Sequence, residues 1–152
     1  MNSIKITSAR SMRLIMILLL GAIMSSCQIR PEAMVPGRDH CDYCKMPYND
    51  NRFGAEIVTG KGKIYKFDDI HCLLDFIQEK RFDTSRPFQT YFVNFLGNHE
   101  LLNAEAAFLL KSEALQSPMG GQTAAFDQLD SLTFMQKQYP GKIYNWKTLP
   151  RS

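Results

Sequence analysis

The sequence predicts an α+β protein in which two small β-β-α(-β) lobes form one compact mature domain behind a lipoprotein signal peptide. Short apolar segments with the composition of strands alternate with two segments whose apolar residues recur at helical spacing. The pair Phe67-Asp68 recurs as Phe126-Asp127, 59 residues later, each time where a strand is expected to end and a helix to begin. Two such units fit the layered packing of α+β proteins.

The chain begins with a segment typical of a signal peptide, which we expect to occupy residues 1–26. Lys5, Arg10 and Arg13 precede or flank the start of an apolar run at Leu14–Ile23. That run has about ten residues, the usual length of a signal-peptide core. It is too short to cross a bilayer as a helix, which takes about 20 residues.

The motif Met24-Ser25-Ser26-Cys27 resembles the lipobox of bacterial lipoproteins, in which the cysteine thiol is acylated. We therefore expect a lipid anchor on Cys27, a tether over residues 27–39 and a folded domain over 40–152. This predicts a lipoprotein of the bacterial cell envelope that faces the periplasm or another extracytoplasmic space. An ordinary secretory peptide and an N-terminal anchor are the alternatives, and the choice of membrane stays open.

The charge of the mature chain argues against nucleic acid as a partner. The leader holds three Lys or Arg residues and no acid, so 15 basic and 15 acidic residues remain after it. The remainder has a formal net charge of zero and no polybasic run. Proteins that bind nucleic acid through their phosphates need a basic surface, which this composition does not supply.

The first lobe, expected at about residues 40–86, contains two predicted strands and a helix. Strands are expected at 52–59 and 63–67, joined by a glycine-containing turn. Asp68 is the predicted N-cap of a helix that runs to about residue 80, with apolar residues at helical spacing.

The second lobe, expected at about residues 87–152, begins with strands at 90–96 and 106–111. A turn at 117–121 leads to a strand at 122–126, a helix at 127–138 and a last strand at 142–146.

A cluster of sulfur-containing residues lies at the start of the folded domain. In Cys41-Asp42-Tyr43-Cys44, the Cys-x-x-Cys spacing places two sulfurs on one side of a turn, where they can bind one metal ion or each other. The thioether of Met46 follows two residues later, and such soft ligands favour Cu(I) over hard cations. With Cys27 committed to lipid, an odd number of cysteines remains, so at least one thiol is free or protected by a bound group.

Two more sulfur residues are candidates for the same chemistry. Cys72 is expected at the start of the first helix, where the helix dipole lowers the pKa of a thiol. Met119 is expected in a glycine-flanked turn, an exposed place that is unusual for a methionine of the core.

Each of these residues also has an ordinary structural interpretation. Cys41 and Cys44 could form a disulfide or half of a structural zinc site, and Cys72 could be a small buried apolar residue. His71 could be a surface or capping residue. The neighbouring Asp68 could serve as a helix cap.

No Ser/His/Asp arrangement, phosphate-binding loop or pair of catalytic carboxylates is recognisable, so we expect a binding protein and not an enzyme. A thiol–disulfide oxidoreductase that uses Cys41 and Cys44 is the alternative from the enzyme class. A redox Cys-x-x-Cys normally opens a helix in a β-α-β unit, whereas this one precedes a predicted strand.

The motifs taken together resemble the NosL family, copper-binding lipoproteins encoded with nitrous oxide reductase. The likeness runs from about Cys41 to Gln138. It rests mainly on Cys44-Lys45-Met46 and Ser117-Pro118-Met119-Gly120, with Phe67-Asp68-Asp69 as a weaker third motif.

This resemblance implies two β-β-α-β-type lobes and Cu(I) binding by cysteine and methionine sulfur. It also implies delivery of copper to a cuproenzyme, nitrous oxide reductase in the family, and contact with the membrane assembly complex that works beside it. Carried over by position, the expected ligands are Cys44, Met46 and Met119, with Cys41 and Cys72 as third or alternative ligands and His71 as the nearest nitrogen donor.

Zinc stays the alternative metal. Cys72 allows a zinc site together with Cys41 and Cys44, with Asp75 one helical turn further along. In that case the metal would hold an interaction domain together and would not be cargo.

Overall fold

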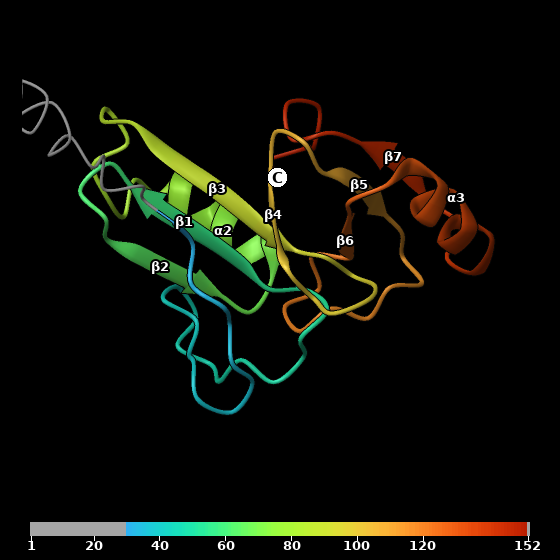
Figure 1. The fold of residues 1–152 in the computed structure, drawn as a ribbon, viewed down its shortest axis with the longest axis horizontal. Coiled ribbons are helices and arrows are strands. Elements are labelled where there is room, and N and C mark those ends of the chain that lie inside the picture. Colours follow the sequence, from blue (N-terminus) through green and yellow to red (C-terminus); the bar gives the residue numbers. More distant parts are fainter. Residues whose placement is uncertain (1–29, 152) are drawn as a thin grey trace, which may run out of the picture.

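A computed structural model describes residues 30–151, in which two antiparallel sheets lie side by side (Figure 1). The predicted signal peptide and the lipidated Cys27 lie outside the described residues. Within the described part, no helix has the length and apolar character needed to cross a membrane.

The first sheet has four strands in the order β2-β1-β3-β4. They are β1 (Ala55–Thr59), β2 (Ile64–Phe67), β3 (Phe88–Val93) and β4 (Leu101–Asn103). Every neighbouring pair is antiparallel. β1 lies in the middle, where Ala55 pairs with Phe67 of β2 and with Phe92 of β3.

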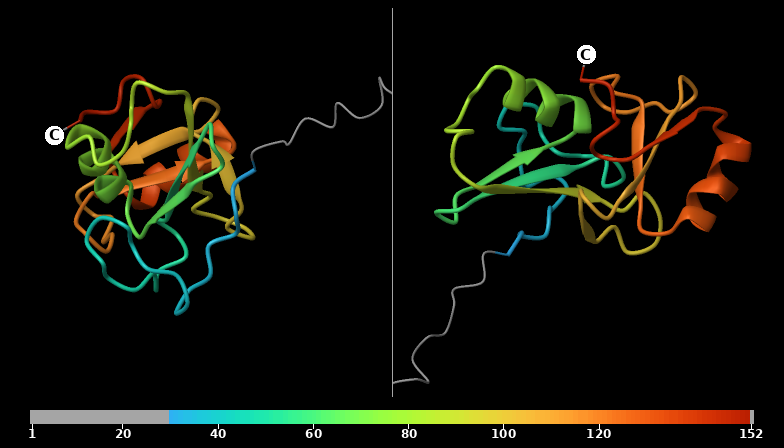
Figure 2. Two further views of the ribbon diagram at one scale, coloured as in Figure 1. Left: turned by 90° about the vertical axis from the view of Figure 1, so that its left-hand side faces the viewer. Right: turned by 90° about the horizontal axis from the view of Figure 1, so that it is seen from above.

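Helix α2 (Ile70–Gln78) packs on one face of this sheet (Figure 2). Its buried residues are Ile70, Cys72, Leu73, Leu74 and Phe76, which gives it a single apolar face. The N-cap is Asp69, whose carboxylate accepts a hydrogen bond from the main-chain N–H of His71. The prediction of Asp68 as the N-cap was therefore wrong by one residue, and Asp68 is left available for another role.

The second sheet has three strands in the order β6-β5-β7, and a helix follows β6. The elements are β5 (Phe108–Lys111), β6 (Thr123–Phe126), α3 (Leu129–Gln138) and β7 (Lys142–Tyr144). β5 is the central strand and pairs antiparallel with both neighbours, as β1 does in the first sheet. The predicted α+β fold with two β-β-α-β lobes is thus confirmed, and the two lobes share this unit, to which the first lobe adds β4.

The chain passes from the first sheet to the second at a later residue than the lobe boundary expected near residue 87. β3 pairs with β1 along the whole length of β1, and β4 pairs with β3, so both belong to the first sheet. The change therefore falls between Asn103 and Phe108. Strand-like composition predicts that a segment is extended, but it does not say which sheet the segment joins.

The two lobes share part of their core. Beyond β3, the N–H of Phe95 donates to the carbonyl of Ala125 in β6 over 2.8 Å, and Asn94 forms a parallel bridge with the same residue. The ring of Phe92 lies 5.4 Å from that of Trp146, centroid to centroid. These contacts join β3 and the segment after it to the second lobe.

Candidate metal centre

Cys41 and Cys44 lie in a tight turn that precedes the first sheet. The N–H of Lys45 donates to the carbonyl of Cys41 over 3.0 Å, and the N–H of Cys41 donates to the carbonyl of Met46 over 2.9 Å. The N–H of Cys44 also points at the sulfur of Cys41, at 3.4 Å. The turn therefore directs both sulfurs to the same side, as the Cys-x-x-Cys spacing predicts.

Hydrogen bonds attach the turn to β2 and to the C-terminal end of α2. The main chain of Asp42 donates to the carbonyl of Lys66 over 2.7 Å, and the Asp42 carboxylate accepts from the N–H of Lys66 over 2.9 Å. The hydroxyl of Tyr43 donates to the carboxylate of Glu79, just after α2, over 2.8 Å. The two cysteines are thus held in a fixed place beside the helix.

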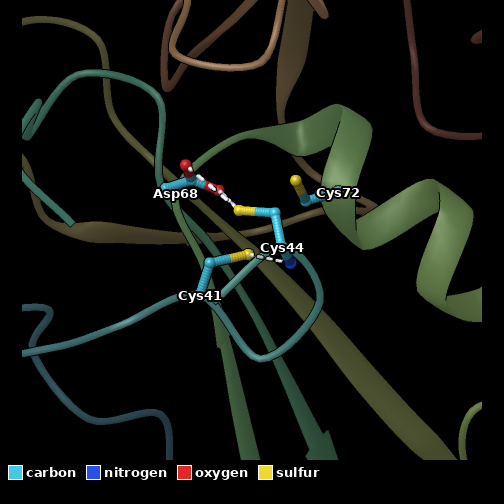
Figure 3. Close-up of side chains that lie close together, drawn as sticks. All are labelled: Cys41, Cys44, Asp68 and Cys72. Atoms are coloured by element: carbon cyan, nitrogen blue, oxygen red, sulfur yellow. Dashed lines mark hydrogen bonds between the residues drawn. The ribbon is translucent and has the colours of Figure 1, made fainter. Parts of the chain in front are cut away.

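Three cysteines and one aspartate meet at this place (Figure 3). The sulfurs of Cys41, Cys44 and Cys72 and a carboxylate oxygen of Asp68 all lie within 4.8 Å of one another, and we call these four residues the thiol cluster. Cys41 and Cys44 come from the turn, Asp68 from the β2–α2 junction and Cys72 from the first turn of α2. The three described cysteines form no disulfide.

Burial divides the cluster into an inner and an outer part. Cys41, Cys72 and Asp68 are buried, and Asp68 is only 2% exposed. Cys44 is half-buried, so it is the member that a partner could reach from solvent. The thiol of Cys44 donates to the Asp68 carboxylate at 3.4 Å, which gives this buried carboxylate a partner.

The pKa values of the three thiols are shifted in different directions. A hydrogen bond from the Cys72 thiol lowers the pKa of Cys41 to about 6. The same interaction, together with burial, raises the pKa of Cys72, and burial raises the pKa of Cys44 to about 11. We expected the helix start to acidify Cys72, but its role as donor to Cys41 outweighs the helix dipole. Of the three thiols, Cys41 is therefore the one that loses its proton most readily.

The donor set suits a thiophilic metal. Thiolates bind Cu(I) and zinc, whereas magnesium and calcium take oxygen ligands. Asp68 was interpreted from the sequence only as a helix cap, and its place in the cluster was missed. One signal could have indicated it: two adjacent aspartates stand at the junction, and the helix needs only one of them as its N-cap.

The predicted methionine and histidine ligands lie outside the four-residue cluster. Met46 is 55% exposed, in the segment directly after Cys44. Met119 is 40% exposed, and its main-chain N–H donates to Asp69, the neighbour of Asp68, over 3.0 Å. The imidazole of His71 is instead directed to Asp75, with Nε2 and Oδ2 3.4 Å apart.

Comparison with known proteins identifies the family and agrees with the fold. The sequence profile of the NosL family matches residues 32–152. The fold is similar to the crystal structure of the copper chaperone NosL from Shewanella denitrificans, with a TM-score of 0.67 and 17% sequence identity over 78% of this chain and 95% of that one. A search of curated proteins finds no match. Because the family match spans nearly all of the described chain, the protein belongs to the NosL family.

Proposed function

We propose that this chain is a lipid-anchored Cu(I) chaperone of the bacterial cell envelope, which carries copper to a cuproenzyme. The observation that carries the proposal is the thiol cluster, where three sulfurs from two separate segments meet and one of them, on Cys44, is accessible. Cu(I) is cargo in this account. Cys44 is its main ligand, the buried thiols Cys41 and Cys72 complete the site, and Met46 and Met119 are the exposed thioethers that receive the ion beside it.

The arrangement suits a carrier because its ligands can be exchanged one at a time. Soft sulfur ligands hold Cu(I) strongly enough to keep it out of solution. The half-buried Cys44 and the exposed methionines are accessible, so a partner's ligands can replace them first. The buried thiols would then release the ion last. A site closed by four protein ligands is typical of structural metals, which are not released.

Family membership supports the same proposal. The structural relative from Shewanella denitrificans is described as a copper chaperone. From what the family resemblance implies, we propose nitrous oxide reductase as the client and its membrane assembly complex as a second partner. The proposed anchor at Cys27 would keep the domain at the membrane where such a complex works. The proposal assigns no catalytic step to Cys41 and Cys44, because they lie in a turn ahead of a strand and not at a helix start.

A Cu(I) titration tests the proposal. The mature chain competes with a coloured Cu(I) chelator under reducing, anaerobic conditions, alongside the variants Cys44→Ser and Met119→Ala. We expect the parent to bind a single Cu(I), Cys44→Ser to lose most of the affinity, and Met119→Ala to bind more weakly while keeping its fold. If both variants hold Cu(I) as tightly as the parent, the ligand assignment is wrong.

A structural zinc site is the second candidate, and the buried Asp68 favours it. Three cysteine sulfurs and a carboxylate make a donor set of the size that zinc takes in structural sites. Metal analysis of protein purified with copper and zinc both available separates the two functions. Copper in the protein supports the chaperone. Zinc that cannot be removed without unfolding the chain supports the structural site.

A further inference from the structure

The turn at residues 117–121 joins β5 to β6 in the second lobe, yet it binds to the helix start of the first lobe. Three of its donors converge on one oxygen, Oδ2 of Asp69. The hydroxyl of Ser117 lies 2.6 Å away, the N–H of Met119 3.0 Å and the N–H of Gly121 3.3 Å. Asp69 itself is 0% exposed, so these bonds are made away from water. Hydrogen bonds to a buried carboxylate are among the strongest a protein makes.

The other oxygen of Asp69 has a separate task. Oδ1 caps α2 by accepting from the N–H of His71 over 2.9 Å. An N-cap needs only this one acceptor, so the three bonds to Oδ2 are additional to what the helix requires. Asp69 therefore joins two parts of the chain that are about 50 residues apart, one on each lobe.

The contact between the turn and the helix start is direct. A Cβ atom on Gly121 would lie 2.4 Å from Oδ1 of Asp69 and 2.7 Å from Cβ of His71, so only glycine fits there. Within the turn, the N–H of Gln122 donates to the hydroxyl of Ser117 over 2.9 Å. The main chain on both sides of Met119 is thus held by hydrogen bonds, whereas the Met119 side chain is partly exposed.

We propose that Asp69 is a positioning residue that holds Met119 beside the thiol cluster. The proposal rests on the proposed function, in which Met119 is a Cu(I) ligand. Asp69 adjoins Asp68, a member of the cluster, and caps the helix turn that carries Cys72. A loose turn would lose backbone entropy when the Met119 thioether binds the ion, and this loss would weaken binding. Because Asp69 already fixes the main chain of Met119, that entropy is lost before binding.

A double-mutant cycle between Asp69 and Met119 tests this role. Asp69→Asn leaves a single acceptor oxygen, which cannot both cap α2 and accept the three bonds from the turn, because the amide NH2 only donates. The competitive Cu(I) titration is run on the mature chain with Asp69→Asn, Met119→Ala and the double variant. Asp127→Asn is the matched control, because Asp127 is the exposed aspartate at the corresponding junction of the second lobe.

We expect Asp69→Asn to weaken Cu(I) binding by about tenfold, the order of magnitude expected when the backbone of one residue must be ordered on binding. The double variant should bind no more weakly than Met119→Ala alone, and Asp127→Asn should bind like the parent. If Asp69→Asn weakens binding equally with and without Met119, its role is merely structural and the proposal is overturned. If Met119→Ala weakens binding but Asp69→Asn does not, the positioning role assigned to Asp69 is wrong, while the proposed function stands. If Met119→Ala binds like the parent, the assignment of Met119 fails, and this proposal fails with it.

A measurement on the metal-free protein distinguishes a local effect of Asp69→Asn on Met119 from misfolding of the variant. With ¹³C-methyl-labelled methionine, the Met119 methyl signal of the metal-free protein should become sharper and move toward its free-chain position in Asp69→Asn. The signal of Met135, which is buried in the second lobe, should not change. The milder Ser117→Ala removes one of the three bonds and leaves the helix cap intact, so it should cause a smaller change in the same direction. An unchanged Met119 signal in both variants contradicts the proposal.

Discussion

In the first lobe the junction between strand and helix is buried and polar, whereas the matching junction of the second lobe is exposed. Phe67 and Phe126 occupy the same position at the end of β2 and β6, and both are fully buried. In the first lobe the next two residues are Asp68 and Asp69, at 2% and 0% exposure. In the second lobe they are Asp127 and Gln128, which are both exposed. The same β-β-α-β unit therefore carries the thiol cluster in one copy and no such cluster, among the described residues, in the other.

The two helices differ in the same way. α2 has five buried residues and a side-chain cap, whereas α3 buries only Leu132 and Met135, and its N-cap residue Gln128 makes no side-chain cap bond. Phe134 of α3 is 67% exposed. Burial and helix capping are thus concentrated in the lobe that holds the thiol cluster. The second lobe supports the first and contributes the turn that carries Met119.

Matched core truncations in the two helices are expected to have the largest effect. Leu73 of α2 and Leu132 of α3 are both fully buried. Leu73→Ala and Leu132→Ala should each lower the free energy of unfolding by about 2–5 kcal/mol, measured by urea denaturation. Only Leu73→Ala should also weaken Cu(I) binding by the folded protein, because Leu73 adjoins Cys72. Equal weakening by Leu132→Ala would show that the lobes are not divided as described.

Two glycines allow a second matched test. A Cβ on Gly121 would meet Asp69 and His71, whereas a Cβ on Gly141 would meet the carbonyl of Lys111 at 2.2 Å, within the second lobe. Gly121→Ala and Gly141→Ala should each lower the free energy of unfolding by about 1–3 kcal/mol, the usual cost of overpacking. Chelator competition should show weaker Cu(I) binding for Gly121→Ala and an unchanged affinity for Gly141→Ala. The reverse order of affinities would contradict the docking of the turn on α2.

The N-terminus of α3 has no side-chain cap, so adding one should stabilise the protein. Gln128 has the extended backbone of an N-cap, as Asp69 has, but its side chain accepts no hydrogen bond from the helix. Gln128→Asp should raise the free energy of unfolding by about 1 kcal/mol, because it supplies an acceptor for a free N–H of the first turn. The Cu(I) affinity should stay the same. No gain in urea denaturation would mean that the two junctions differ in more than this one side chain.

The smallest expected effect concerns pH. Glu56 of β1 is fully buried, and burial raises its pKa to about 7, although the N–H of Glu32 and the charge of Lys66 lower it. Between its ordinary pKa of 4.5 and about 7, the folded chain holds a proton that the unfolded chain has lost. The contribution of Glu56 to stability is therefore present below pH 4.5 and is lost as the pH rises to about 7.

Glu56→Gln should remove this part of the pH dependence. Urea denaturation between pH 4.5 and 8 should show the parent losing stability relative to Glu56→Gln as the pH rises. All three buried carboxylates of the described residues, Glu56, Asp68 and Asp69, belong to the first lobe, so a variant at the exposed Asp127 should follow the parent. Parallel curves for the parent and Glu56→Gln would contradict the raised pKa.

Much of the fold could be predicted because local patterns determine it. The strands, the two helices and the Phe-Asp junctions follow from alternation, helical spacing and turn residues. β4 was missed because three residues that include Asn103 carry too little pattern. The placement of β3 in the first sheet depends on its pairing with β1, a long-range choice on which local propensity has no bearing.

The site could be predicted in part for a similar reason. Residue chemistry alone indicated Cys41, Cys44 and Cys72 as metal ligands, and the structure brings their sulfurs together. The role of Asp68 was missed although the adjacent pair of aspartates indicated it, because it depends on the Cys41–Cys44 turn folding back onto the helix start. The link from Asp69 to Met119 could not be predicted, because it arises from the way the second lobe packs on the first. Met46, Met119 and His71 as ligands stay predictions.

X-ray absorption at the copper K-edge of the Cu(I)-loaded mature chain tests the central claim most directly, because it reports which atoms bind the ion. We expect an inner shell of sulfur only, which loses a scatterer in Met119→Ala and is lost in Cys44→Ser. A shell of nitrogen or oxygen, or a sulfur shell that neither variant changes, would contradict this claim.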